Sequence, residues 1–311
     1  MSFGHQHSHS DPAAADYAGH RDRLLLCCAV TAAVVAAQAV GAWLTGSLAL
    51  LTDAVHSAAD SIGLVAAVTA AGLMLRAPSS SRTWGYRRAE ILAGLLQAAL
   101  LLSMGVYAVV EGVQRLSSPQ EIPSVQLLAF AAAGLVGNLI SLRILAGVRR
   151  ENLSVRAAFL EVFADALGSA GVMAAAVIIW LTGWQQADSV AALLIAGVII
   201  PRAAVLLRET GRILLEFAPR GLDVDQVRQH ILQIDHVQDV HDLHASTVAT
   251  GLPVLSAHVV LDDECFTDGC APEKLAELRS CVAEHFDVAV EHATFQLETA
   301  AHARTERSTH A

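Results

Sequence analysis

The sequence predicts an α-helical membrane protein: a bundle of six transmembrane helices followed by a small α+β domain. Of its 311 residues, 54% are hydrophobic and only 16% are charged. The mean hydropathy is +0.48, which is unusual for a soluble protein of this length. The hydrophobicity is uneven, because the residues after 210 have an ordinary soluble composition. These two observations place a membrane domain first and a soluble domain after it.

Six apolar segments are each long enough for the roughly 20 residues that a membrane-crossing helix needs. They span residues 24–44, 48–75, 89–115, 124–147, 155–181 and 187–208. Two connections, Thr45–Ser47 and Thr182–Gln186, are so short that they predict antiparallel helical hairpins. Pro201 should kink the sixth helix, because proline has no amide hydrogen to donate.

Arginine placement predicts the orientation in the membrane. Arginines precede the first segment, fill the connections after the second and the fourth, and follow the sixth: Arg21, Arg23, Arg76, Arg82, Arg87, Arg88, Arg149, Arg150, Arg208, Arg212 and Arg220. The opposite side has essentially Arg115 alone. The positive-inside rule therefore puts both termini in the cytoplasm, and we expect an integral protein of a bacterial plasma (inner) membrane.

The region after the bundle alternates between helical and strand patterns. We expect helices at 223–233 and 272–286, and strands at 237–247, 254–261 and 288–297. The order αββαβ predicts a two-layer domain of ferredoxin-like or metallochaperone-like type. The predicted domains are a His-rich disordered tail (1–20), the transmembrane domain (21–210), the α+β domain (211–299) and a polar tail (300–311).

Charge and cysteine content exclude some functions. The net charge of −10 comes largely from the C-terminal part and argues against a nucleic-acid partner. The five cysteines form neither a disulfide framework nor a CxxC knuckle, which suits a reducing compartment. The N-terminal tail contains His5, His7, His9 and His20, which either bind metal transiently or have no role.

Two apolar segments contain paired ionisable residues. Residues 50–64, LLTDAVHSAADSIGL, place His56 and Asp60 four residues apart, so both lie on one helical face. Residues 159–168, FLEVFADALG, repeat the pattern with Glu161 and Asp165. Ionisable groups at membrane depth are costly and usually face a partner, a cavity or an ion. The two pairs predict a four-ligand site for one divalent cation.

Other polar residues also interrupt the apolar segments. Asp53 shares a face with Asp60 and is either a structural or access-path residue or a direct ligand. Gln97 and Asn138 are expected to form hydrogen bonds between helices, with contact to an ion as the alternative. Glu111 suits the membrane interface or an access path better than a ligand role.

Together these features resemble the cation diffusion facilitator (CDF) family of divalent-metal/proton antiporters, over roughly residues 20–299. The resemblance rests on the αββαβ domain and on three stretches: GSLALLTDAVHSAADSIGL, WGYRRAEILAGL and LEVFADALGSAGV. It implies a homodimer that exports zinc or another divalent metal from the cytoplasm in exchange for protons, by alternating access.

The resemblance assigns the transport site to His56, Asp60, Glu161 and Asp165. Glu161 stands where histidine is usual, so Co²⁺, Cd²⁺, Fe²⁺ and Mn²⁺ are expected beside Zn²⁺. Arg88 and Glu216 match a charge pair. His241, His258 and His292 match a regulatory zinc site, with Glu298 a further candidate, while His244, Cys265 and Cys270 are more remote ones. The loop RAPSSSRTWGYRR contains none of the usual metal ligands, so we expect no site there.

Three other functions remain as rivals. In a metal sensor without transport, the membrane domain would be only an anchor, which the four buried ionisable residues argue against. A channel would conduct without saturation or proton dependence. An intramembrane metalloenzyme is disfavoured because the sequence contains no HExxH motif. We therefore expect a transporter rather than an enzyme.

Overall fold

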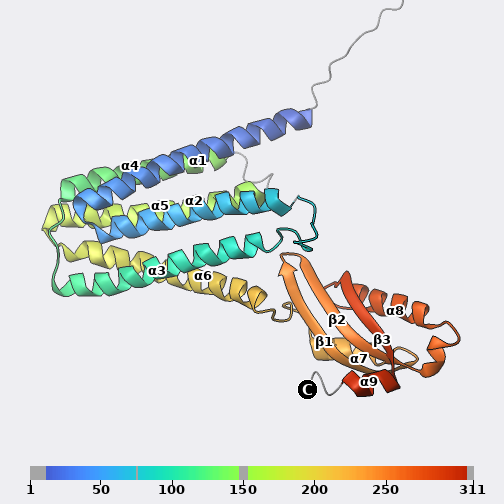
Figure 1. Cartoon of the computed structure of the whole chain (residues 1–311). Coiled ribbons are helices and arrows are strands. Elements are labelled where there is room, and N and C mark those ends of the chain that lie inside the picture. The colour runs from blue at the N-terminus through green and yellow to red at the C-terminus, as the bar shows by residue number, and fades with distance from the viewer. Residues whose placement is uncertain (1–11, 75, 147–152, 307–311) are drawn as a thin grey trace, which may run out of the picture. The chain divides into compact units, whose positions relative to one another are not determined.

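The computed structural model describes residues 12–74, 76–146 and 153–306. Its first part contains six long helices (Figure 1): α1 (Pro12–Thr45), α2 (Leu48–Met74), α3 (Ala89–Ser117), α4 (Ser124–Ala146), α5 (Leu153–Thr182) and α6 (Gln186–Leu214). The chain divides into two compact units. One comprises residues 1–68 and 96–207, and the other comprises residues 69–95 and 208–311.

The first unit is a helical membrane domain. Within the described ranges, five helical stretches are long and apolar enough to cross a membrane: Leu26–Thr45, Ala89–Ser117, Ser124–Ala146, Ala158–Thr182 and Gln186–Leu214. Buried residues of α1, α2, α4, α5 and α6 form one apolar core, which includes Leu50, Leu127 and Val172. The six helices come close to the six predicted segments, because long apolar runs allow few alternatives.

Helix α1 begins earlier than expected. The sequence predicts a disordered tail through residue 20, but the helix already begins at Pro12 and so includes His20. Proline is favoured in the first turn of a helix, and the three alanines that follow have the highest helix propensity. His5, His7 and His9 lie outside the described residues.

The start of α2 is capped by a residue from α6. The Asp188 carboxylate accepts hydrogen bonds from the Leu48 amide at 2.7 Å and from the Ser47 hydroxyl. The first amides of a helix have no partner within the helix, so a buried carboxylate at this point satisfies them. The two short connections, at Gly46 and Gly183, both use the positive φ that glycine adopts easily.

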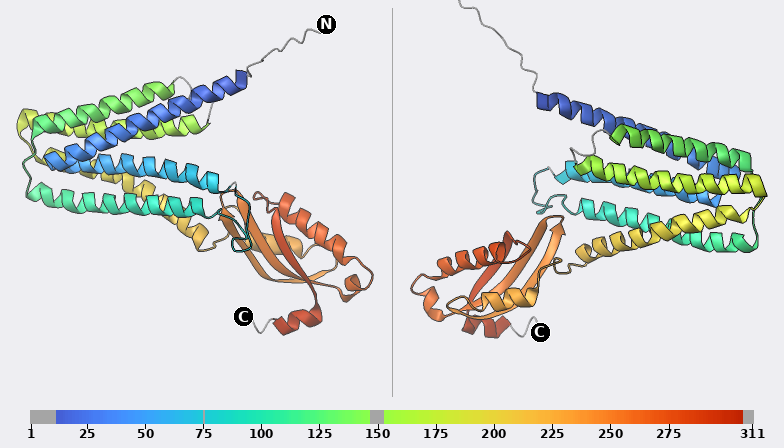
Figure 2. Two further views of the ribbon diagram at one scale, coloured as in Figure 1. Left: turned by 45° about the horizontal axis from the view of Figure 1, so that its top comes forward. Right: turned by 180° about the vertical axis from the view of Figure 1, so that it is seen from behind.

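The second unit contains a three-stranded mixed sheet in the order β1-β2-β3. Its elements are α7 (Val224–Ile231), β1 (Val237–Ala249), β2 (Leu252–Leu261), a 3₁₀ turn η1 (Asp263–Phe266), α8 (Ala271–Glu284), β3 (His292–Thr299) and α9 (Ala300–Glu306). β1 and β2 pair antiparallel, and β2 and β3 pair parallel. α7 and α8 lie on the same face of the sheet (Figure 2, right).

Three features of this domain differ from the sequence prediction. Residues 300–306, predicted as part of a polar tail, form α9. The 3₁₀ turn η1 was not predicted. The last strand begins at His292 rather than Val288, because the Val290 amide donates to the Val282 carbonyl of α8 at 3.0 Å instead of pairing with β2. Val290 thus closes the end of α8 and remains buried in the core.

Candidate metal centres

α2 and α5 bring three of the four predicted transport ligands together. The Nε2 atom of His56 lies 3.7 Å from an Asp60 carboxylate oxygen and 3.9 Å from an Asp165 oxygen. One ligand atom from each residue lies within 4.8 Å of the others. His56 and Asp165 are 7% and 3% exposed. Helical i, i+4 spacing places His56 and Asp60 on one face, and α5 supplies Asp165 from across the helix pair.

Three buried polar atoms of this cluster lack hydrogen-bond partners. They are Asp60 Oδ2, Asp165 Oδ1 and His56 Nδ1, and all three are shielded from solvent. An unsatisfied buried carboxylate is costly, and a cation between the two carboxylates and the imidazole would remove that cost. Tetrahedral zinc with bonds of about 2.0–2.2 Å needs its ligand atoms roughly 3.3 Å apart. The two His56–carboxylate distances exceed this spacing by about 0.4 and 0.6 Å, so the side chains would have to move closer together to bind a divalent cation.

Glu161 is not part of this cluster. It lies one turn before Asp165 on α5 and is half-buried. It is absent from the group of residues whose ligand atoms approach within 4.8 Å. The structure therefore assembles His56, Asp60 and Asp165, while a ligand role for Glu161 stays a prediction.

Two features surround the cluster. Gln97 of α3 donates to Asp60 Oδ1 at 3.3 Å, which confirms the predicted interhelical hydrogen bond. A cavity of about 430 Å³ extends along α5 and α6, and His56 and Arg202 both line it. Its other lining residues are almost all apolar. Arg202 was not identified from the sequence; it lies six residues before Arg208, the first of the arginines at the end of α6.

Asp53 lies in a separate network rather than in the cluster. Its Oδ2 accepts hydrogen bonds from Gln38 Nε2 of α1 at 2.6 Å and from Ser169 Oγ of α5 at 2.8 Å. Asn138 of α4 donates to the same Ser169 hydroxyl at 3.1 Å, as predicted for an interhelical contact. A Cβ on Gly168 would lie 2.3 Å from Asp53 Oδ1, so glycine allows the close approach. Four helices meet at Asp53, which favours the structural role among the alternatives.

The second unit contains another cluster, formed by His241, His258 and Glu298. His241 and His258 are paired across β1 and β2, and their rings are 5.1 Å apart. Glu298 of β3 is hydrogen-bonded to His241 and lies 3.9 Å from His258. It is 3% exposed, and its Oε2 atom has no hydrogen-bond partner. Ala257, Val259 and Leu297 pack toward the helices, so strand alternation puts this cluster on the other face of the sheet.

His292 does not join this cluster, contrary to the grouping predicted from the sequence. It pairs with Val254 in the parallel ladder, four residues before His258. That separation is roughly 13 Å along a strand. The His292 ring instead packs against Trp84, with centroids 4.8 Å apart. The presence of a histidine on each of three strands does not by itself create a shared metal site, because the strand register decides which side chains lie next to each other.

Two nearby residues were missed in the sequence. Asp242 lies 2.9 Å from His244 and 3.7 Å from His258, at a bulge where its φ is +49°. His302 of α9 lies 3.8 Å from Glu298 Oε2. His302 follows Glu298 by four residues, a spacing that brings the two side chains together because residues 300–306 are helical.

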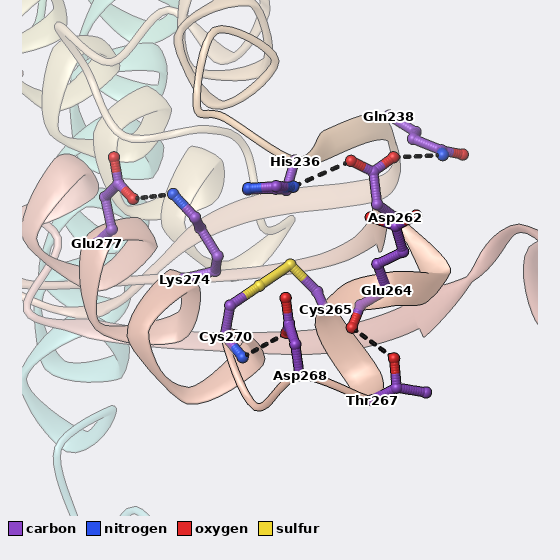
Figure 3. Close-up of a disulfide and its surroundings, with 10 residues drawn as sticks. All are labelled: His236, Gln238, Asp262, Glu264, Cys265, Thr267, Asp268, Cys270, Lys274 and Glu277. Carbon is purple, nitrogen blue, oxygen red and sulfur yellow. Dashed lines mark hydrogen bonds and ion pairs between the residues drawn. A yellow bond between two sulfur atoms is a disulfide. The ribbon is translucent and has the colours of Figure 1, made fainter.

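Cys265 and Cys270 are joined by a disulfide around η1 (Figure 3). This corrects the expectation of unpaired cysteines, and it removes both thiols as metal ligands in this form. Asp268, between them, accepts a hydrogen bond from the Cys270 amide at 3.0 Å. The short turn that η1 supplies brings the two cysteines together, and η1 was not visible in the sequence pattern.

Arg88 and Glu216, the predicted charge pair, lie in the second unit with Nη2 and Oε1 3.0 Å apart. Glu216 ends α6 in a left-handed conformation with φ of +58°. Its backbone amide donates to Ile213, and the next amide donates to Arg212. This C-terminal capping geometry fixes the backbone from which the Glu216 side chain reaches Arg88.

The comparison with known families agrees with this arrangement. Residues 24–215 match the family described as the cation efflux transmembrane domain, and residues 219–300 match the cation efflux protein cytoplasmic domain. The metal cation efflux system protein CzcD of Cupriavidus metallidurans is 38% identical over 300 residues, covering 96% of this chain and 91% of the relative.

Two further relatives have informative names. The cadmium, cobalt and zinc/H(+)-K(+) antiporter of Bacillus velezensis is 33% identical, covering 96% of this chain and 93% of its own length. The zinc transporter ZitB of Escherichia coli is 34% identical, covering 95% of this chain and 93% of its own length. Because the family matches extend over both units, this chain is an integral membrane protein and belongs to the cation diffusion facilitator family of cation efflux transporters.

Proposed function

We propose that this protein exports divalent metal cations from the cytoplasm in exchange for protons. The observation that carries the proposal is the cluster of His56, Asp60 and Asp165, buried between α2 and α5, in which three polar atoms have no hydrogen-bond partner. Relatives named for cation efflux, zinc transport and cadmium, cobalt and zinc antiport support it. A sensor without transport would have no use for buried ionisable groups at this depth.

The proposal requires α2 to be the sixth crossing, with both termini in the cytoplasm. Its 27 residues would extend about 40 Å at 1.5 Å per residue, enough for a hydrocarbon core of about 30 Å. Asp53, His56 and Asp60 interrupt its apolar sequence, as expected of the helix that contacts the cargo. We also propose a ferredoxin-like αββαβ core for the C-terminal domain, with α9 added.

In the proposed cycle, the same three side chains bind metal or protons but not both. Metal binding needs neutral imidazole and ionised carboxylates, so protons entering from the far side displace the cation. Movement of the helix bundle around a fixed site would expose the cluster to each side in turn. His56 is suited to carry a proton because an imidazole titrates near neutral pH.

Charge balance favours a broad range of cargo. One neutral histidine and three carboxylates, counting Glu161, sum to −3, so a divalent cation leaves −1. Arg202, on the wall of the cavity that reaches His56, would offset that charge. A site with mostly oxygen ligands accepts harder ions than a site with two histidines does. We therefore propose Zn²⁺, Co²⁺, Cd²⁺, Fe²⁺ and Mn²⁺ as candidate cargoes.

We further propose that His241, His258 and Glu298 hold a regulatory zinc ion in a homodimer. The Oε2 atom of Glu298, which has no hydrogen-bond partner, and the adjacent imidazoles suit a borderline cation. The match of residues 219–300 to the cytoplasmic domain of efflux proteins supports dimerisation through this domain.

Metal uptake into proteoliposomes under an imposed pH gradient tests the transport proposal. Wild-type protein should take up zinc in a saturable manner that collapses with the gradient, while Asp60→Ala and Asp165→Ala should abolish uptake and still fold. Glu111→Ala is the matched carboxylate control, because Glu111 pairs with Arg115 near the C-terminal end of α3 and not with the cluster; this variant should transport normally. Normal zinc flux in either cluster variant would refute the site, and flux independent of the gradient would refute proton exchange.

A further inference from the structure

The helix layer of the C-terminal domain contains a third group of metal-ligating side chains. His230 of α7, Cys281 of α8 and His285 at the end of α8 each place a ligand atom within 4.8 Å of the other two. His230 Nε2 and His285 Nδ1 are 3.0 Å apart. No sequence motif marks the group, because its members are 51 and 4 residues apart and come from two helices.

This group is distinct from the His241–His258–Glu298 cluster. α7 and α8 cover one face of the sheet (Figure 2, right), whereas the cluster occupies the opposite face. Val227 and Ile231 of α7 and Leu278 and Val282 of α8 are buried in the same core, which fixes the two helices against each other. The three candidate ligands lie at the edge of that core, with Cys281 2% exposed and His285 open to solvent.

The group could be explained without a metal, as a cysteine of the core beside a hydrogen-bonded pair of histidines. Two neutral imidazoles at 3.0 Å share one hydrogen, but this contact does not use the thiol. The ring of Phe286, 5.6 Å from that of His230 and edge-on to it, holds the His230 imidazole in place. The result is a rigid pair of nitrogens beside a sulfur atom, an arrangement that packing alone does not need.

The separation of the two imidazole nitrogens suits a tetrahedral ion, and the Cys281 sulfur lies within 4.8 Å of both. Zinc bonds of about 2.0–2.1 Å to nitrogen and about 2.3 Å to sulfur put ligand nitrogens roughly 3.3 Å apart and nitrogen and sulfur roughly 3.6 Å apart. A cation replacing the shared hydrogen would therefore increase the distance between the two imidazole nitrogens by only about 0.3 Å. Three protein ligands leave a fourth position open toward the exposed side of His285.

We propose that His230, Cys281 and His285 form a third metal site, which takes thiophilic and borderline cations such as Zn²⁺, Co²⁺ and Cd²⁺. A thiolate with two imidazoles favours these ions over Mn²⁺, which prefers oxygen ligands. The site links α7 to α8 and lies outside the membrane domain. It therefore responds to metal independently of the transport ligands and of the cluster on the opposite face.

Cobalt spectroscopy of the full-length protein in detergent, without thiol reductant, isolates this site. A cobalt–thiolate bond gives near-ultraviolet charge-transfer absorption, which the nitrogen and oxygen ligands of the other two clusters do not give. At saturation we expect the intensity of the wild-type band to correspond to one thiolate-bound cobalt per protomer, while cobalt bound at the other two clusters adds nothing to it. Cys281→Ala should abolish it, whereas Cys28→Ala and the double variant Cys265→Ser/Cys270→Ser should retain it.

His285→Gln covers the possibility that the buried Cys281 variant fails to fold, since position 285 is exposed. It should weaken cobalt binding, measured by the same band, by about tenfold or more. Manganese should not displace the cobalt, while cadmium should. A wild-type protein without the band, or a band that persists in Cys281→Ala or is unchanged in His285→Gln, would overturn the proposal. Proton-driven zinc flux should continue in Cys281→Ala, so a failure of this proposal can be distinguished from a failure of the transport proposal.

Discussion

Asp53 provides the sharpest test of whether a buried carboxylate in α2 is structural or a ligand. Asp53→Ala removes the acceptor of two interhelical hydrogen bonds, from Gln38 and Ser169. In membrane proteins such bonds contribute about 0.6 kcal/mol on average and up to about 1.7 kcal/mol. The free energy of unfolding should therefore fall by about 1–3 kcal/mol. Gln38 and Asn138 keep their hydrogen bonds to the Ser169 hydroxyl, which limits the loss.

Gly168→Ala perturbs the same contact from the other side. The added methyl group would lie 2.3 Å from Asp53 Oδ1, so the carboxylate must move and its hydrogen bonds weaken. Overpacking of this kind costs about 1–3 kcal/mol. In the Asp53→Ala background the opposing oxygen is gone, and Gly168→Ala should then cost much less. The two single changes should therefore be strongly non-additive.

The assay combines unfolding in mixed micelles with zinc affinity at the transport site. Asp53→Ala should be less stable but bind zinc nearly as well as wild type. Asp60→Ala is the matched control, because it removes a carboxylate of the proposed site about two turns further along α2 and should lose affinity by about tenfold or more. Unchanged stability with lost zinc affinity in Asp53→Ala, or additive effects of the two single changes, would refute the reasoning.

Three further predictions concern the second unit. His258→Ala should lower zinc binding at the sheet cluster, measured by calorimetry on the Asp165→Ala background, whereas His292→Ala should not; equal effects would restore His292 as a ligand. Arg88→Gln should change the free energy of unfolding by less than about 1 kcal/mol, because the Arg88 and Glu216 side chains are 44% and 61% exposed; a larger loss would contradict this. Hydrogen bonds from Gln238 and His236 lower the pKa of Asp262 (Figure 3), so its stabilisation is present above the ordinary aspartate pKa of about 3.9 and is lost as pH falls through the lower folded value. Asp262→Asn should therefore lower the melting temperature at pH 7 but not at strongly acidic pH, and an equal loss at both would exclude the ionised carboxylate as the cause.

The positions of the helices were predictable where one local physical constraint dominates. Apolar length alone positioned the long helices, since a chain in lipid must satisfy its backbone hydrogen bonds internally. Residues 223–233 were predicted as a helix that starts after Asp223, and the Asp223 side chain does accept hydrogen bonds from the Asp225 and Gln226 amides. Both signals are local, so neither depends on how distant parts of the chain pack.

Contacts that depend on register or on a second element were not predictable. His258 meets His241 because β1 and β2 pair at that residue, and it misses His292 because β3 runs parallel with Val254 opposite His292. The group of His230, Cys281 and His285 needs α7 and α8 to cover the same face of the sheet. The Cys265–Cys270 disulfide depends on a 3₁₀ turn that has no periodic signature.

Glu161 shows the same limit within a single helix. The i, i+4 spacing establishes that Glu161 and Asp165 share a face, but it leaves their Cβ atoms about 6 Å apart along the helix. An ion bound between His56, Asp60 and Asp165 lies at one height in the bundle, and Asp165 already occupies that height on α5. Glu161, one turn away, reaches the same ion only if α5 moves along its axis or if the longer glutamate side chain extends toward it. Spacing alone therefore predicts which residues face the cargo, while the relative heights of α2 and α5 decide which of them bind it at the same time.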